Sequence, residues 1–148
     1  MAGLPIPTDV AEFFGDRMLV CYMATVRPDG ALANVAMGVV IHEGRIRIST
    51  PAETLKVRNL RQNPQVALCV PYPEDARRFL MIRGTVEIAE DTDRQFVRWI
   101  TRTHMGRDEH PFDPPRTPRV VITLVPERFI FSGAQGTAER TPLSGAQT

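Results

Sequence analysis

The sequence predicts a mostly β fold in which six antiparallel strands close into a small barrel with helices at its periphery. Six segments of strand length are apolar or alternate between apolar and polar residues, and tight-turn signals separate several of them. A single helical segment crosses between the third and fourth strands. Closing the sheet is the economical way to remove its exposed edges. We expect one barrel domain over residues 1–132 and a flexible tail over residues 133–148, where the composition is small and polar.

Composition excludes several classes of protein. The chain of 148 residues is 43% hydrophobic and 24% charged with a net charge of +1, which argues against a nucleic-acid partner. No apolar run approaches the roughly 20 residues needed to cross a membrane, and the N-terminus lacks a secretory signal. We therefore expect a cytoplasmic protein without a membrane partner. Cys21 and Cys69 lie in apolar runs and are predicted to be free core thiols.

The first third of the chain predicts one short helix and three strands. Thr8 or Asp9 is placed to cap a helix that runs to Phe14 and ends at Gly15. Turn signals then divide the chain, at Pro28-Asp29-Gly30 and again at Glu43-Gly44. The strands around these turns are residues 17–27, 31–42 and 45–50, the last alternating strictly.

A second helix is predicted directly after the third strand. Thr50 and Glu53 fit a capping box, and Pro51 sits at a position where its missing N–H costs nothing. A strand end that feeds a helix N-terminus presents free backbone amides and the positive end of the helix dipole. Phosphate or carboxylate groups are therefore expected to bind at this strand–helix junction.

Lys56 is the most informative residue of this helix, because it is the only lysine in the chain, against seventeen arginines. Counting about 100° per residue from Ala52 places Lys56 and Asn59 in the stripe that faces the protein, together with Leu55 and Leu60. An unpaired buried ammonium costs several kcal/mol. Either Lys56 contacts a ligand phosphate, with Asn59 as a second polar contact, or it flanks a packed helix and reaches water.

The rest of the chain predicts three strands and a third helix. The strands are residues 65–71, 77–89 and 120–131, with a bulge or close backbone approach at Gly84 and a bend at Pro126. Thr92 and Gln95 form a second capping box, which opens a helix that ends near Met105. A Pro-rich loop, residues 106–118, follows this helix. One face of the helix is formed by Phe96, Trp99, Ile100 and Thr103.

Four separated motifs resemble the flavin and deazaflavin split β-barrel family, often labelled pyridoxamine 5′-phosphate oxidase-like. They are M-A-T-V-R-P-D-G-A-L-A-N-V from Met23, G-R-I-R-I-S-T from Gly44, L-K-V-R-N-L-R-Q-N-P-Q-V-A-L-C-V from Leu55 and I-R-G-T-V-E-I from Ile82. They occur in the family's order, and the resemblance covers about residues 8–131. It implies a six-stranded split β-barrel and a homodimer with two cofactor sites at the subunit interface.

The resemblance also implies which residues bind the cofactor. Its phosphate is expected at Lys56, Thr50 and Asn59, with Arg58 nearby. The ring is expected against the second and third strands, near Asn34, Val35, Ile48 and Ser49. Arg77 and Arg78 are candidates for a phosphate or an acidic tail, although a solvated arginine pair fits the pattern equally.

Two departures from the family pattern change the expected chemistry. The chain ends in E-R-T-P-L-S-G-A-Q-T, whereas a true pyridoxamine phosphate oxidase carries a Trp- and Arg-rich substrate segment there, so vitamin B6 synthesis is not expected. Met37 and Gly38 stand where many relatives have aromatic residues beside the ring, which implies a more open pocket. His42, His104 and His110 are too dispersed for a metal site.

The K-x-R-N-L-R-x-N-P pattern and the arginine-rich, lysine-poor composition resemble the branch that uses coenzyme F-420, with FMN as the alternative cofactor. The implied reaction is hydride transfer from the reduced deazaflavin to a conjugated double bond in a small organic substrate. In this class the cofactor carries the hydride chemistry, which fits a sequence without a recognisable catalytic triad motif. The competing hypothesis is a protein that carries a flavin, deazaflavin or haem without turnover.

Overall fold

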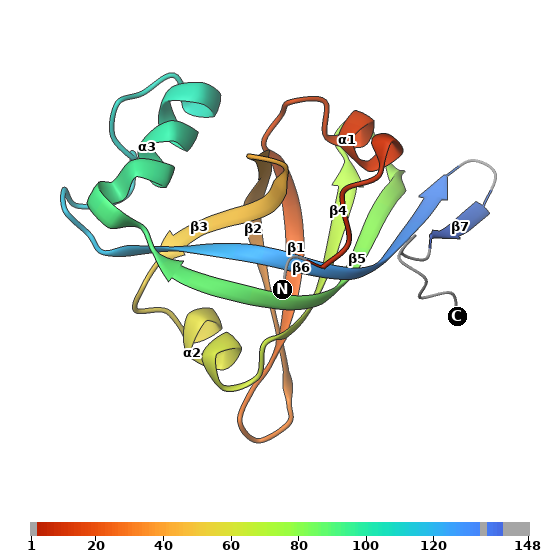
Figure 1. The fold of residues 1–148 in the computed structure, drawn as a ribbon, viewed down its shortest axis with the longest axis horizontal. Helices are drawn as coiled ribbons and strands as arrows, with labels where there is room; N and C mark the ends of the chain where they lie inside the picture. Colours follow the sequence, from red (N-terminus) through yellow and green to blue (C-terminus); the bar gives the residue numbers. More distant parts are fainter. Residues whose placement is uncertain (1–2, 134–135, 141–148) are drawn as a thin grey trace.

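The computed structural model describes residues 3–133 and 136–140 of the chain. Six antiparallel strands follow one another in the order β3-β2-β1-β4-β5-β6, and β6 pairs back onto β3, so the sheet closes into a ring (Figure 1). This confirms the expected six-stranded split barrel. The strands are β1 (Leu19–Val26), β2 (Leu32–His42), β3 (Arg45–Pro51), β4 (Gln65–Tyr72), β5 (Asp75–Glu90) and β6 (Arg119–Gly133).

A seventh strand, β7 (Gly136–Arg140), pairs with the end of β6, outside the ring. It extends the sheet into the segment that the sequence predicts as a tail. Residues 134–135 and 141–148 of that segment lie outside the described residues.

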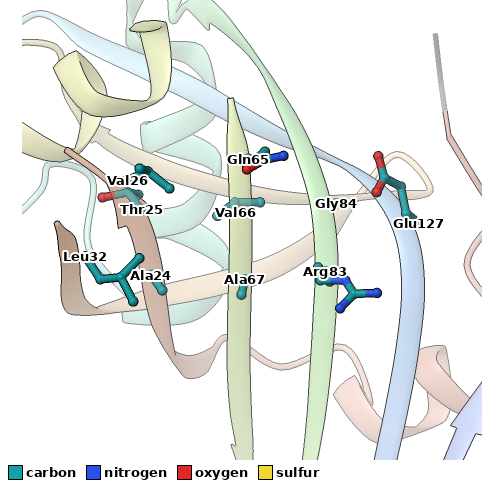
Figure 2. Close-up of a pocket in the computed structure, with 10 residues that line it drawn as sticks. All are labelled: Ala24, Thr25, Val26, Leu32, Gln65, Val66, Ala67, Arg83, Gly84 and Glu127. Atoms are coloured by element: carbon teal, nitrogen blue, oxygen red, sulfur yellow. The ribbon is translucent and has the colours of Figure 1, made fainter. Parts of the chain in front are cut away.

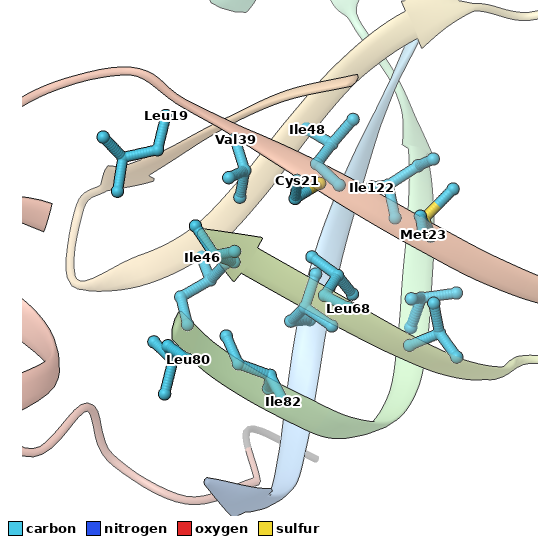
Figure 3. Close-up of a cluster of buried hydrophobic side chains, with 14 of the residues drawn as sticks. Leu19, Cys21, Met23, Val39, Ile46, Ile48, Leu68, Leu80, Ile82 and Ile122 are labelled. Carbon is cyan, nitrogen blue, oxygen red and sulfur yellow. The ribbon is translucent and has the colours of Figure 1, made fainter. Parts of the chain in front are cut away.

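The barrel core is built by alternation along the strands. Along β3, Ile46 and Ile48 are buried between less buried neighbours, and Leu68, Leu80 and Ile122 meet them from three other strands (Figure 3). Such two-residue periodicity directs every second side chain to one face. Two helices complete this core: α1 (Thr8–Phe14) contributes Val10, Phe13 and Phe14, and α2 (Leu55–Gln62) contributes Val57 and Leu60.

The two cysteines are free and point to opposite faces of the sheet. Cys21 is fully buried in the core, whereas Cys69 is opposite Tyr22 and is only partly buried on the outer face. The prediction of free thiols is confirmed, and the core position holds for Cys21 alone.

Gly84 marks a break in register between β5 and β6, as the sequence predicts. The pairing shifts between Arg83 and Gly84. A Cβ atom at Gly84 would lie 2.2 Å from the Val125 carbonyl oxygen, so only glycine fits this close approach of two backbones.

The ring is split between β2 and β3. These strands share only three residue pairs, which end at Val40 and Arg47, whereas β1 and β2 continue together to Val26 and Leu32. Residues 32–38 of β2 therefore form an edge that β3 does not cover. An uncovered edge exposes backbone N–H and C=O groups.

The predicted capping box at Thr50 and Glu53 is wrong. Thr50 and Pro51 remain in β3, opposite Val120 and Arg119 of β6, and the helix begins only at Leu55. The long-range pairing with β6 satisfies the backbone that the local motif would have capped. Thr54 occupies the N-cap position, and its hydroxyl donates to the Pro51 carbonyl oxygen at 3.3 Å.

The third helix also starts differently from the prediction. A 3₁₀ turn (Thr92–Arg94) precedes α3 (Gln95–Ile100), and the carboxylate of Asp91, not a capping box, accepts hydrogen bonds from the N–H groups of Phe96 and Val97 at 2.8 and 2.9 Å. A π-helical turn (Thr101–Met105) ends the segment where expected. Its wider turn buries Thr101 in place of Thr103.

The α1 helix begins at Thr8 and ends at Gly15 in a left-handed conformation, as predicted, but Pro7 is its N-cap and no side chain caps it. No helix in the described part of the chain is long and apolar enough to span a membrane.

Candidate cofactor site

The junction between β3 and α2 places Lys56 at the edge of the barrel. Val57 and Leu60 turn into the core, Leu55 is 45% exposed, and Lys56 is half-buried between them. The predicted inward stripe is thus shifted, because Ala52 precedes the helix and does not set its rotation. Lys56 keeps the partly buried position that made it informative.

The surroundings of Lys56 disfavour its charged form. Burial and the positive charge of Arg119 together lower the pKa of the Lys56 ammonium. Within residues 3–133, no carboxylate lies within ion-pair distance of Lys56. A partly buried ammonium that lacks a carboxylate partner would be stabilised by a bound anion.

Asp113 and Ser49 hold the guanidinium of Arg119 in place. Arg119 donates to both carboxylate oxygens of Asp113, at 2.5 and 2.9 Å, and to the Ser49 hydroxyl at 3.0 Å. All of this lies on the outer side of β3, because Ser49 is opposite Val121 while Ile48 and Thr50 are buried inward. The Arg119 guanidinium lowers the pKa of the Asp113 carboxyl, so Asp113 stays ionised.

Four of the predicted contact residues therefore separate into two groups. Ser49 and Arg119 are hydrogen-bonded on the outer side of β3, and the charge of Arg119 acts on Lys56; we call these three residues the phosphate corner, after the group that the sequence predicts there. Ile48 is fully buried in the core and Thr50 is 2% exposed, so their side chains face the barrel interior. Sequence reasoning missed Arg119 and Asp113, because only the closure of β3 onto β6 brings them to Ser49.

The buried side chain of Asn59 links α2 to β1 through a hydrogen bond. Its side chain is 1% exposed and its amide donates to the Thr25 hydroxyl at 3.1 Å. Thr25 is opposite Ala33 of β2, and Asn34 is the next residue along that strand. This hydrogen bond thus joins α2 to β1, the strand that pairs with the uncovered part of β2. Arg58 is exposed on the same helix.

The uncovered edge of β2 carries two of the four residues predicted to lie against the ring. Asn34 and Val35 are exposed, and Met37 packs partly against the core. Gly38 is also exposed, and a Cβ atom there would lie 2.9 Å from the Met18 sulfur. No aromatic side chain stands on this edge, in line with the sequence.

Arg77 and Arg78 lie away from the phosphate corner within one chain. They begin β5, beside the far end of β4, and eight strand residues separate that end from α2, about 26 Å. Arg77 pairs with Asp75 at 3.0 Å, and the Arg78 guanidinium lies 4.2 Å from the Tyr72 ring centroid. The structure does not bring this pair to Lys56 within a protomer.

The outer face of β1, β4 and β5 is apolar and hollowed. Val20, Tyr22 and Met81 are 55%, 46% and 40% exposed, and Leu32 at the hairpin is 76% exposed. Apolar surface of this kind marks interaction sites. We call this the outer apolar face. Its hollow, of about 280 Å³, is lined by Ala24, Thr25, Val26, Leu32, Gln65, Val66, Ala67, Arg83, Gly84 and Glu127 (Figure 2).

The three histidines do not meet. The ring centroids of His42 and Trp99 lie 4.4 Å apart, and those of His104 and Trp99 lie 5.4 Å apart. His110 lies 3.7 Å from Asp113, which places it one contact away from Arg119. Burial lowers the pKa of each imidazole, which favours the neutral form near pH 7.

Comparison with known proteins places this geometry in a family. The family model described as pyridoxamine 5′-phosphate oxidase matches residues 7–133. A protein named F420 reductase is 31% identical, with a TM-score of 0.70 over 84% of this chain and 98% of its own. No curated protein sequence matches the chain.

Two more distant solved structures share the fold. A NimC/NimA family protein from Clostridium acetobutylicum is 17% identical, with a TM-score of 0.66 over 89% of this chain and 91% of its own. A haem-binding protein from Mycobacterium smegmatis is 14% identical, with a TM-score of 0.67 over 88% of this chain and 56% of its own. The chain therefore belongs to the pyridoxamine 5′-phosphate oxidase-like family of flavin-binding split barrels.

Proposed function

We propose that this protein is an oxidoreductase that binds coenzyme F-420 and passes a hydride to a conjugated double bond of a small organic substrate. The observation that carries the proposal is the partly buried side chain of Lys56, which has no carboxylate within ion-pair distance among the described residues. A phosphate fits this corner, since it supplies the missing negative charge. The 31% identity to an F420 reductase favours the deazaflavin.

Each residue near the corner has a distinct role in holding the cofactor. Lys56 contributes a point charge to the phosphate, and Arg119, whose fork of donors is held by Asp113, contributes positive charge nearby. The hydrogen bond from Asn59 to Thr25 joins the helix to β1, the strand that pairs with β2. The bound deazaflavin supplies two-electron hydride chemistry.

The uncovered edge of β2 suits the ring of the cofactor. Its free backbone N–H and C=O groups can pair with the polar edge of a flavin-like ring. Asn34 adds a side-chain donor and acceptor at the same edge. With Met37 and Gly38 in place of aromatic residues, the ring is left open on one side, where a substrate can stack.

The proposal includes a homodimer formed through the outer apolar face. A two-fold interface pairs the same patch on both copies, which buries the exposed Val20, Tyr22 and Met81 together. A second copy is also the means by which Arg77 and Arg78, remote from Lys56 in one chain, would approach a cofactor.

FMN is the alternative cofactor, because its phosphate would use the same corner. The test is to mix purified protein with reduced F-420 and a panel of enones and tetrapyrroles, and to follow cofactor reoxidation by absorbance. Reoxidation that depends on an enone, and that is lost in Lys56→Met, supports the proposal. Tight F-420 binding with no substrate-dependent reoxidation would instead indicate a carrier.

A further inference from the structure

The helical segment between β5 and β6 packs on the barrel through a small hydrophobic cluster of its own. Figure 1 shows α3 at one side of the barrel, apart from the other two helices. Phe96 and Ile100 of α3 are buried with Val40 of β2, and these three residues lie outside the main core. An element that buries few apolar side chains is among the first to open locally. The docking of α3 is therefore sensitive to the other groups at this contact.

Two imidazoles contact the indole of Trp99 beside this cluster. The centroid of the His42 ring, at the end of β2, lies 4.4 Å from that of Trp99 and 5.0 Å from that of Phe96. His104, in the π-helical turn, meets Trp99 edge-on with centroids 5.4 Å apart. We call His42, Trp99 and His104 the histidine latch, because one histidine belongs to the barrel and the other to the helical segment.

His42 is held in its neutral form by a hydrogen bond. Its Nδ1 atom lies 3.0 Å from a terminal nitrogen of Arg47. A guanidinium can only donate, so Nδ1 accepts and the imidazole carries its proton on Nε2. Protonation would turn Nδ1 into a donor and place a second positive charge against Arg47. The carboxylate of Glu43 lies 3.9 Å from Nδ1, but it is exposed and is already paired with Arg47 at 3.0 Å.

The other acidic groups near His42 offer little compensation for such a charge. Glu90 and Asp91 line a hollow that His42 also lines. Asp91 is bound to two backbone N–H groups of α3, and Glu90 is exposed. Within residues 3–133, neither carboxylate forms an ion pair with His42. Burial and the charge of Arg47 outweigh the attraction of Glu43, so the pKa of His42 lies below its usual 6.5.

His104 also lacks a partner for a second proton. Its Nε2 atom is buried without a hydrogen-bond partner. Among the described residues, no carboxylate lies within ion-pair distance of its ring, and burial alone lowers its pKa. A charged imidazole there would have no counter-charge. Both histidines are therefore neutral while α3 is docked, and both bind a proton more readily once it leaves the barrel.

We propose that the histidine latch is a pH-sensitive device, which holds α3 and its π-helical turn on the barrel near neutral pH and releases them when His42 and His104 are protonated. Because docking favours the neutral rings, its stabilising contribution is complete above 6.5 and is lost as the pH falls below that value. Release would expose Phe96 and Ile100 to water.

The released segment continues toward the phosphate corner. The backbone N–H of Arg107 donates to the carbonyl oxygen of the buried Thr101 at 3.0 Å, which joins the π-helical turn to the loop that follows. In that loop, Asp113 binds Arg119 through both carboxylate oxygens. The latch and this support of the phosphate corner therefore lie on one continuous segment.

The fluorescence of Trp99 tests the proposal directly, because it is the only tryptophan in the chain. Emission is recorded on the cofactor-free protein between about pH 7.5 and about pH 5. We expect a reversible shift to longer wavelength on acidification, with a midpoint below 6.5, while the far-UV circular dichroism of the barrel persists. Hydrogen exchange, corrected for its intrinsic pH dependence, should show at least about tenfold faster opening of residues 95–105 at acidic pH, with β4 and β5 unchanged.

Substitution of the histidines assigns the transition to the latch. His42→Asn keeps an acceptor for Arg47, and His104→Phe keeps a ring against Trp99, but neither residue can be protonated. Each single variant should retain only part of the transition, and the double variant should show none. His110→Asn is the matched control, because His110 is the third histidine of the chain and lies outside the latch. Its transition should match that of the wild type.

An emission spectrum that does not change with pH, or a transition that the single and double variants retain in full, would overturn the proposal. So would a transition that disappears in His110→Asn, or a spectral change without faster exchange in residues 95–105. None of these measurements uses a cofactor, so their failure leaves the reoxidation test of the proposed function untouched.

Discussion

Replacing Lys56 with methionine tests the phosphate corner while leaving the packing of the helix in place. Methionine keeps the apolar stem that lies between Leu55 and Val57 and removes only the ammonium. In the ligand-free protein the change also removes the repulsion between Lys56 and Arg119. The variant should therefore fold at least as well as the wild type.

The Lys56→Met variant should bind the cofactor with lower affinity. A charge-assisted contact to a phosphate contributes about 1.5–3 kcal/mol, which corresponds to a loss of about 10- to 150-fold in affinity. Titration of the intrinsic fluorescence or calorimetry with F-420 measures this loss, and Arg107→Met serves as a control for the change in net charge. Unchanged affinity in Lys56→Met, with a fold that is intact by circular dichroism, would refute the assignment.

The difference in free energy of unfolding between the wild type and Lys56→Met should depend on pH. Because the folded protein lowers the pKa of Lys56 below its usual 10.5, the unfolded chain binds more protons in the window between the two values. The free energy of unfolding of the wild type should thus rise, relative to Lys56→Met, as the pH approaches 10.5. Urea titrations of both proteins across this window check the sign, and a constant difference would contradict it.

Four further substitutions probe the scaffold and the proposed dimer interface. Gly84→Ala places a Cβ against the Val125 carbonyl and should lower the free energy of unfolding by about 1–3 kcal/mol or more, whereas Gly38→Ala, which meets only the flexible Met18 side chain, should cost less in the same urea titration. Asp113→Asn leaves the buried Arg119 guanidinium without a counter-charge and should lower the free energy of unfolding by about 3–5 kcal/mol. The wild-type advantage should fade as the pH drops below 3.8, through the lowered pKa of Asp113. Tyr22→Glu places a charge on the outer apolar face and should convert a dimer into monomers. Light scattering measures the molar mass, and an unchanged mass would exclude this face as the interface.

Strand positions could be predicted because their signal is local. Residues such as Ile46 and Ile48 alternate with arginines, and that period alone assigns them to an inward face. The bulge at Gly84 was predictable for the same reason, since glycine inside a strand pattern indicates a close approach.

The start of the second helix could not be predicted from local pattern. Thr50 and Glu53 satisfy a capping motif, but pairing of Thr50 with Val120 keeps this stretch in the sheet. That pairing joins residues seventy positions apart, and no local motif reports it. The helix rotation inferred from Ala52 was displaced as a result, which is why Leu55 is exposed and Val57 buried.

Only part of the candidate site could be predicted from the sequence, for a related reason. Lys56 stands out in sequence, as a lone lysine in an apolar stripe. Arg119 and Asp113 do not, because they are two charged residues among many, and they reach Ser49 only when the barrel closes.

The most direct test of the central claim is a competition between the two cofactors. Purified protein is equilibrated with equal concentrations of F-420 and FMN, freed of unbound ligand on a desalting column, and examined by absorbance. The phosphate corner with a deazaflavin preference predicts a retained F-420 spectrum that is lost in Lys56→Met. A retained yellow FMN spectrum, or equal retention of F-420 by the variant, would contradict it.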